Sequence, residues 1–227
     1  MSLIVYGDFT CPACYLASWR ADLLDDGPDR VDWRAVEHHP LLPLKGQRGG
    51  PQNREQSVRW QAMSVLVSPE EDLPGRVSAL LASTQAAVAG YAEAYRSGVA
   101  ERVRRLLFQA YWVDGLDIGD PEVLRVLLGE TIRGGRSDSR PVQEWGYAVS
   151  PARGPVSSGA YRLIKSWRSQ RFDLGEQPCP LLIGVGSSPM NGREAMAELG
   201  RRVADRVSEP HQLPPLSERR SSERFWY

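Results

Sequence analysis

Two cysteines three positions apart are the residues of this chain best suited to chemistry. Cys11 and Cys14 lie in the segment GDFTCPACYLASWR, where an apolar run gives way to a helix-like pattern. Such a pair can form a redox disulfide, bind a metal, or pack as two buried thiols. Three cysteines in 227 residues are too few for a disulfide scaffold, and in a reducing compartment a CxxC pair is more often catalytic or metal-binding than structural.

The segments that flank the pair predict a βαβ unit. Residues 3–6, LIVY, form a short apolar run typical of a strand covered on both faces. Apolar residues recur at helical spacing over 15–24, and apolar and polar residues alternate over 31–38. A strand, a helix and a second strand in about forty residues favour two parallel strands joined by a right-handed connection.

A long helical block is predicted to follow this unit. Residues 45–56, KGQRGGPQNREQ, predict a polar surface loop, and no strand signal occurs from about Arg54 to Val149. Asp120 and Pro121 suit the N-cap and first position of one helix in the block. Aromatic residues at helical spacing favour core packing of the block, although some could face a substrate: Tyr91, Tyr95, Phe108, Tyr111 and Trp112.

The end of the chain returns to a strand and a helix. LLIGV at 181–185 predicts a strand, and 192–207 predicts an amphipathic helix. The element order therefore predicts a small α/β sheet interrupted by an all-α insertion. The expected division is a first sheet segment at 1–50, a helical insertion domain at 51–149, a second sheet segment at 150–208, and a proline-rich polar tail at 209–227.

Four segments, taken in order, give the sequence a specific resemblance. It resembles the DsbA-like branch of the thioredoxin superfamily, and within it the cytosolic FrnE-like proteins. The segments are YGDFTCPACY, WRAVEHHPLLP, LFQAYWVDGLDIGDPEVL and CPLLIG, and the resemblance extends to about Val207. It implies a thioredoxin-like fold with an all-α insertion domain and a thiol–disulfide oxidoreductase that needs no cofactor.

Physical chemistry assigns different roles to the two cysteines of the motif. A helix start carries unpaired N–H groups and the positive end of the macrodipole, which favour a nucleophilic thiolate at Cys11. Pro12 fits the first helical turn because its missing donor would have no partner there. Cys14, one turn further in, is expected to resolve the mixed disulfide. Ala13 stands where the strongly oxidising family member has a histidine, so a milder oxidant is expected.

A late proline is the second expected functional feature. The fold places a cis-proline opposite the CxxC, and the resemblance puts it at Pro180, beside backbone that can hydrogen-bond a substrate peptide. Pro178 is a rival, but it would leave a second proline inside the strand. Cys179 is a departure from the uncharged residue usual before this proline. It is expected either to fill that slot as a small apolar side chain or to act as an alternative resolving thiol.

Metal binding and other histidine roles are the remaining site hypotheses. Three thiols with His38 or His39 could make a Cys3His zinc site, but the spacing is not that of a zinc finger, and no metal is expected. The histidines end a predicted parallel strand, at the edge where α/β sites form. His39 could therefore line the substrate groove, or its ring could be satisfied by a carbonyl of the turn.

Composition limits partners and location. Lys and Arg together number 28, as do Asp and Glu, so no global field favours nucleic acid or an anionic membrane. The first residues have too short an apolar run for a signal peptide, and no later run reaches membrane-spanning length. A cytosolic protein is expected, acting on protein or peptide thiols and disulfides or on glutathione, with its oligomeric state left open.

A different enzyme class shares the same architecture. Kappa-class glutathione transferases and 2-hydroxychromene-2-carboxylate isomerases carry the same insertion-bearing fold, but use a serine where Cys11 stands and need no second cysteine. The intact Cys-Pro-Ala-Cys sequence favours disulfide exchange. Glutathione-dependent transfer or isomerisation remains the alternative.

Overall fold

A four-stranded mixed sheet forms the centre of the computed structural model, which describes residues 3–68, 71, 77–175 and 177–208. The strand order is β2-β1-β5-β6, with β1 parallel to β2 and antiparallel to β5. The predicted tail at 209–227 lies outside the described residues. The strands of this sheet are β1 (Leu3–Gly7), β2 (Val31–Ala35), β5 (Leu181–Ile183) and β6 (Met190–Asn191).

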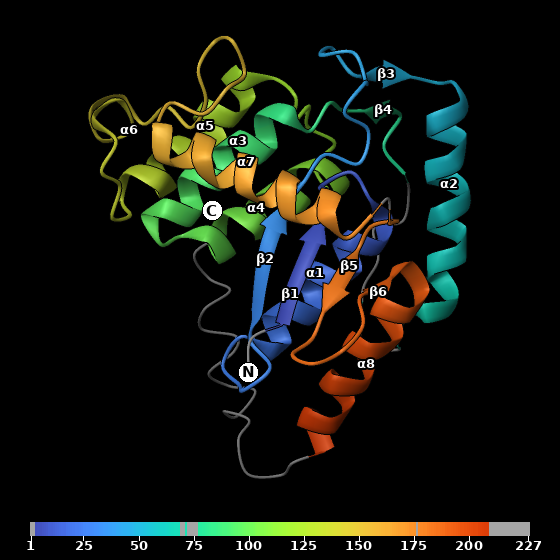
Figure 1. Cartoon of the computed structure of the whole chain (residues 1–227). Helices are drawn as coiled ribbons and strands as arrows, with labels where there is room; N and C mark the ends of the chain where they lie inside the picture. Colours follow the sequence, from blue (N-terminus) through green and yellow to red (C-terminus); the bar gives the residue numbers. More distant parts are fainter. Residues whose placement is uncertain (1–2, 69–70, 72–76, 176, 209–227) are drawn as a thin grey trace.

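Eight helices are described, and several lie around this sheet. They are α1 (Pro12–Leu24), α2 (Pro51–Met63), α3 (Gln85–Ser97), α4 (Ala100–Trp112), α5 (Pro121–Arg133), α6 (Arg140–Trp145), α7 (Ser158–Asp173) and α8 (Gly192–Ser208). Figure 1 shows α7 crossing in front of the upper end of the sheet and α1 behind it. Within the described chain, no helix is both long and apolar enough to span a bilayer.

The predicted βαβ unit is confirmed. In β2 the side chains of Val31, Trp33 and Ala35 are buried while Asp32 and Arg34 are half-buried, as the alternation predicts. β1 pairs with β2 in parallel register over five residues. The CxxC segment therefore lies within this unit, at the junction between β1 and α1.

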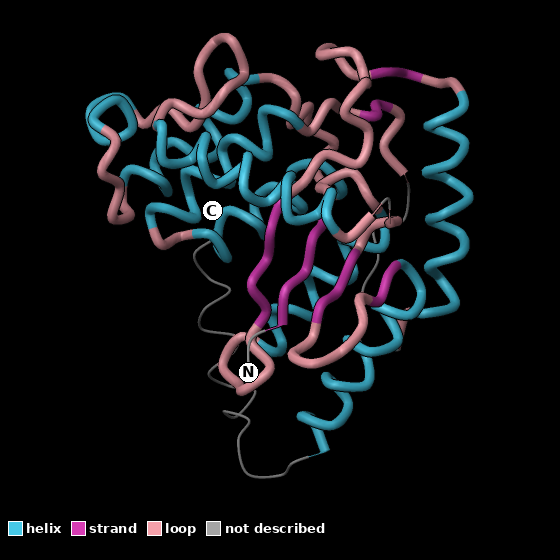
Figure 2. The backbone as a smooth tube through the Cα atoms, viewed as in Figure 1, coloured by secondary structure: helices cyan, strands magenta, loops and turns pink. Residues whose placement is uncertain are grey.

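The predicted loop at 45–56 is wrong in part. The chain forms β3 (Gln47–Arg48), which pairs with β4 (Leu80–Leu81), and α2 begins at Pro51. Gly50 has a φ of 100°, which favours glycine, and Pro51 is preorganised for the first helical turn. The expectation of no strand before Val149 is therefore also wrong at β4, and Figure 2 shows this short second ladder apart from the main sheet.

The predicted start of the helix at Asp120 and Pro121 is confirmed. Asp120 caps α5, since its Oδ1 accepts a hydrogen bond of 2.9 Å from the N–H of Glu122. α3 ends at Ser97, and Gly98 takes the left-handed conformation with φ 75°. Aromatic side chains join the block to the sheet: the ring centroids of Trp33 in β2 and Phe108 in α4 lie 5.6 Å apart. Of the five aromatic residues predicted to pack in the core, all but Tyr95, which is 37% exposed, are buried.

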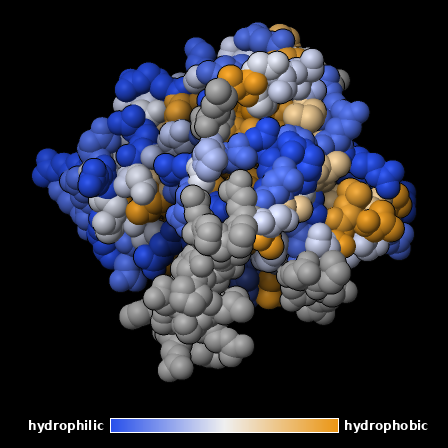
Figure 3. Space-filling model, turned by 90° about the horizontal axis from the view of Figure 1, so that it is seen from below, coloured by the Kyte–Doolittle hydropathy of each residue, from blue (hydrophilic) through white to orange (hydrophobic). Residues whose placement is uncertain are grey.

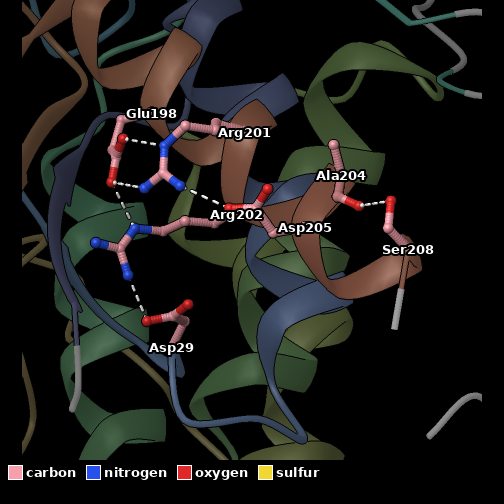
Figure 4. Close-up of polar contacts among 7 residues, drawn as sticks. All are labelled: Asp29, Glu198, Arg201, Arg202, Ala204, Asp205 and Ser208. Atoms are coloured by element: carbon pink, nitrogen blue, oxygen red, sulfur yellow. Dashed lines mark hydrogen bonds and ion pairs between the residues drawn. The ribbon is translucent and has the colours of Figure 1, made fainter. Parts of the chain in front are cut away.

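An ion-pair network lies along α8 and reaches the turn that follows α1 through one pair. Glu198 binds Arg201 at 2.8 Å and Arg202 at 2.7 Å, and Arg201 also binds Asp205 at 2.6 Å. Arg202 reaches across to Asp29 (Figure 4). Most of these side chains are partly in solvent, where an ion pair contributes about 0–1 kcal/mol. Packing of α8 on α1, rather than this network, therefore holds the helix in place.

Candidate active site

The CxxC segment lies where β1 ends and α1 begins. Cys11 is the N-cap residue of α1, with φ −84° and ψ 123°, and Pro12 is its first helical residue. The Cys11 N–H donates to the carbonyl of Asp8 at 3.2 Å. All three cysteines are free and buried, with Cys11 at 4%, Cys14 at 0% and Cys179 at 3% exposure. The helix start thus places Cys11 outermost and Cys14 one turn inward.

A buried carboxylate fixes the approach to this helix. Oδ1 of Asp8 accepts hydrogen bonds from the N–H and hydroxyl of Thr10, at 2.7 and 2.6 Å. Oδ2 accepts from the N–H of His38 at 2.7 Å and the hydroxyl of Thr84 at 2.8 Å. With four donors, Asp8 ties the segment after β1 to the segment after β2. The carboxylate therefore positions both the CxxC and His38.

Side chains from the helical block hold the same segment. The amide of Gln56 on α2 donates to the carbonyl of Thr10 at 2.8 Å and to the Tyr111 hydroxyl at 3.0 Å. The indole N–H of Trp112 donates to the carbonyl of Phe9 at 3.0 Å. Gln56 and Trp112 therefore anchor the backbone in front of the CxxC, and Tyr111 holds the Gln56 amide in place.

The third thiol faces the pair from the start of β5. The Cys179–Pro180 peptide bond is cis, which places the cis bond at the proline favoured by the strand argument. The Cys11 thiol donates to the carbonyl oxygen of Cys179, with 3.6 Å between sulfur and oxygen. Cys14 interacts with the sulfurs of both Cys11 and Cys179. The CxxC and the residue before Pro180 thus form one three-thiol cluster.

The environments of the two inner thiols differ in charge. Burial, together with hydrogen bonds to the neighbouring thiols, raises the pKa of Cys14 well above its usual range. The pKa of Cys179 is lowered to about 5. The largest cause is a hydrogen bond from Cys14; interactions with His38 and Arg171 also lower the pKa, and burial opposes the shift. The Arg171 guanidinium lies 3.6 Å from the Cys179 sulfur. The cationic Arg171 side chain therefore stabilises negative charge on the Cys179 sulfur.

His38, rather than His39, approaches the thiols. Its interaction with Cys179 raises the pKa of His38, while burial opposes the shift. Nη1 of Arg59 lies 2.8 Å from Nε2 of His38; a guanidinium only donates, so this nitrogen accepts. Burial lowers the pKa of His39, which lines a crevice of about 10 Å³ beside Cys11.

An open groove leads to Cys11. Its volume is about 450 Å³, and Cys11, Ala13 and Cys179 line it together with residues of α2 and the turn that follows. Met63, Val65 and Leu66 contribute apolar surface; Arg59 and Arg193 contribute positive charge. Seen from below in Figure 3, hydrophobic surface gathers on the side where α2 ends, and Val65 there is 71% exposed. The groove suits a ligand with an apolar body and negative charge.

Several predicted residues are brought together, and others were missed. Cys11, Cys14 and Cys179 meet beside Pro180, with Pro12 and Ala13 at the same helix start; Pro178 lines the groove. No sequence pattern pointed to Arg59, Arg171 and Arg193, which come from α2, α7 and α8. In the described residues, no group of three or more His, Cys, Asp or Glu side chains is arranged to hold a metal ion.

The low pKa of Cys179 predicts an unusual titration of the reduced protein. A thiol with a pKa of about 5 is ionised above that pH and becomes neutral below it. We expect the ultraviolet absorbance of one thiolate to persist at neutral pH and to disappear only as the pH falls through about 5. Cys179→Val should lose the absorbance of this one thiolate at neutral pH, whereas Arg168→Gln, which removes a neighbouring cation on α7, should keep it. Full loss of signal in Arg168→Gln would contradict the assignment.

Comparisons with known proteins agree with this geometry. The DSBA-like thioredoxin domain family matches residues 2–131. No curated protein sequence matches the chain.

Solved structures show the same fold at low sequence identity. The cytosolic disulfide reductase DsbM from Pseudomonas aeruginosa with GSH is 15% identical, with a TM-score of 0.61 over 93% of this chain and 100% of that one. A probable DsbA oxidoreductase from Streptomyces coelicolor is 16% identical, with a TM-score of 0.64 over 95% and 93%. A 2-hydroxychromene-2-carboxylate isomerase is 19% identical, with a TM-score of 0.53 over 90% and 98%. By the family match over more than half its length, the chain belongs to the DSBA-like thioredoxin domain family.

Proposed function

We propose that the protein is a thiol–disulfide oxidoreductase in which Cys11 is the nucleophile and Cys14 the resolving thiol. The observation that carries this proposal is the position of Cys11 at the N-terminus of α1 and on the wall of the groove, with Cys14 buried one turn behind it. Only one of the two sulfurs then meets a substrate, and the other is close enough to displace it. Cysteine, not serine, at this position favours exchange over the isomerase alternative.

The chemistry balances with the substrate disulfide alone. The Cys11 thiolate attacks one substrate sulfur, the substrate S–S bond breaks, and the first product leaves as a thiolate. Cys14 then attacks the Cys11 sulfur, and the second product leaves as a thiolate that takes up the Cys14 proton. The substrate gains two electrons, and the enzyme is left with a Cys11–Cys14 disulfide. Reversal of the same steps oxidises a dithiol.

The groove supports peptide or small thiol disulfides as the substrates. Its volume of about 450 Å³ can hold a short cysteinyl peptide, and Arg59 and Arg193 offer partners for carboxylates. The backbone beside Pro180 is proposed to pair with such a peptide as a strand does. The likeness to a disulfide reductase solved with GSH supports glutathione as one partner, and supports a cytosolic location.

A glutathione redox titration with mass tags on free thiols tests the proposal. In Cys179→Val, where no third thiol can exchange, we expect Cys11 and Cys14 to lose their tags together, as one two-electron couple, and Ala13 to leave the pair less oxidising than a motif with histidine. The Cys179→Val variant isolates this couple from the third thiol. If that variant formed no Cys11–Cys14 disulfide under oxidising buffer, the proposed reaction would be wrong.

The positive charge of the groove predicts a preference for anionic substrates. Arg193 is exposed at the groove, and loss of one exposed charge interaction costs up to about 1 kcal/mol, which corresponds to about a threefold to fivefold change in affinity. We therefore expect Arg193→Gln to raise KM for oxidised glutathione by this factor and to leave kcat nearly unchanged. With hydroxyethyl disulfide, which carries no charge, KM should not change. An equal change for both substrates would contradict an electrostatic role.

A further inference from the structure

The proposed reaction leaves Cys179 unused, although this residue lies within the reacting cluster. Its side chain is buried, with 3% of the residue exposed, between the CxxC and the end of α7. It also lines the substrate groove together with Cys11. A packed apolar side chain would fill this slot without charged neighbours.

Cationic and polar groups surround the Cys179 sulfur instead. Nη2 of Arg171 lies 3.6 Å from it, and the same nitrogen donates to the carbonyl of Gln177 at 2.6 Å, which fixes the guanidinium in place. The ring of His38, which follows β2, also interacts with the sulfur. The carboxylate of Asp8 accepts a hydrogen bond from the His38 N–H and holds this backbone in place. Such a setting stabilises a thiolate, which is the reactive form of cysteine.

Cys14 is the neighbour that the other two thiols share. It interacts with the sulfurs of both Cys11 and Cys179, while Cys11 reaches the Cys179 carbonyl rather than its sulfur. When Cys14 enters a disulfide with Cys11, its S–H no longer donates to Cys179. Among the described residues, Arg171 and His38 then remain as partners of the Cys179 thiolate, which faces a disulfide sulfur.

We propose that Cys179 is a third redox thiol that displaces Cys11 from the Cys11–Cys14 disulfide. The inference rests on the proposed function, because it uses the disulfide which that reaction forms. The Cys179 thiolate bonds to the Cys14 sulfur, the Cys11–Cys14 bond breaks, and its electron pair leaves on Cys11. The charge moves from Cys179 to Cys11, and no proton, electron or outside reagent is required.

The exchange changes what the oxidised protein presents to the groove. Before it, Cys11 is blocked in a disulfide. After it, the oxidising equivalent is stored between Cys14 and Cys179, and Cys11 is again a free nucleophile. An oxidised protein can then attack a second disulfide through Cys11, which a two-cysteine site cannot do.

Trypsin separates the two disulfides cleanly. Cleavage after Arg20 leaves Cys11 and Cys14 in one peptide, and cleavage after Arg171 and Arg193 leaves Cys179 in another. A Cys11–Cys14 disulfide therefore closes a loop within one peptide, whereas a Cys14–Cys179 disulfide links two. The experiment treats the reduced full chain with one equivalent of oxidised glutathione, removes glutathione, traps free thiols with iodoacetamide, and maps the peptides by mass.

We expect to find linked peptides in which Cys11 is alkylated. Their fraction should grow with trapping time, because alkylation removes free Cys11 from the equilibrium between the Cys11–Cys14 and Cys14–Cys179 disulfides. In oxidised Cys179→Val, alkylation of Cys11 should be at least about tenfold slower, because no third thiol remains to release Cys11 from the Cys11–Cys14 disulfide. Cys179→Ser checks the same point with a polar side chain, in case valine disturbs folding.

Arg171→Gln provides a second readout that keeps all three thiols. It should slow the appearance of linked peptides, whereas the matched Arg168→Gln should not, because Arg168 pairs with Glu37 instead of the sulfur. The inference is overturned if wild type shows only the Cys11–Cys14 loop with alkylated Cys179. Failure of the proposed function looks different: no disulfide to Cys11 would form in wild type or in Cys179→Val.

Discussion

Replacing Cys11 by serine is expected to lower the turnover of disulfide substrates by about 10³-fold or more, because a hydroxyl at this position supplies no thiolate and cannot form a disulfide. Serine preserves size, and Cys11 is buried at the N-cap of α1, so the fold should persist. The measurement is reduction of oxidised glutathione or of a cysteinyl peptide disulfide, with circular dichroism to verify folding.

Cys14→Ser is the matched control for this result. It leaves Cys11 free to attack but removes the resolving thiol, so a mixed disulfide between Cys11 and the substrate should accumulate and be visible by mass. Cys11→Ser should form none. Retained glutathione-dependent isomerase or transferase activity in Cys11→Ser would contradict the exchange mechanism, since enzymes of that alternative class use serine there.

The largest stability effect is expected at Arg20, a buried cation on α1. Its guanidinium pairs with Glu71 at 2.6 Å, and both side chains are 4% exposed. It also donates to the carbonyls of Met196 and Leu66, at 2.6 and 2.7 Å. Arg20→Leu leaves the Glu71 carboxylate buried without its partner, which costs about 3–5 kcal/mol. Urea unfolding should show this loss in the free energy of unfolding.

Arg201→Leu is the control for the loss of an arginine ion pair. Arg201 pairs with Glu198 and Asp205 on the exposed side of α8, and its side chain is 56% exposed (Figure 4). Its removal should leave the free energy of unfolding nearly unchanged, because exposed ion pairs contribute little to stability. The double variant Arg20→Leu/Glu71→Leu should recover part of the loss, because it leaves no charge buried alone. Equal effects of Arg20→Leu and Arg201→Leu would show that the buried pair has no special weight.

Local patterns in the sequence were sufficient for the frame of the site. Val31, Trp33 and Ala35 alternate as β2 requires, and Asp120 caps α5 as its position predicts. These features depend on residues a few positions apart, which is the range over which periods of 2 and 3.6 residues operate. The same reasoning failed at 45–56, because α2 lacks a clear apolar face and is held by distant contacts, such as Gln56 with Thr10.

Local sequence patterns predict the CxxC at a helix start, the proline that follows Cys179, and the α/β fold with its helical insertion. They do not predict which charged side chains surround these residues. In α1, helical spacing marks Trp19 and Leu23 as apolar positions that should face the core, but both are only half-buried. Arg20, between them, is buried instead. Arg171 and His38 meet at Cys179 from α7 and from the end of β2. A thiolate is stabilised by groups within a few ångströms in space, and folding brings His38 to Cys179 from a segment more than a hundred residues away, beyond the reach of any local pattern.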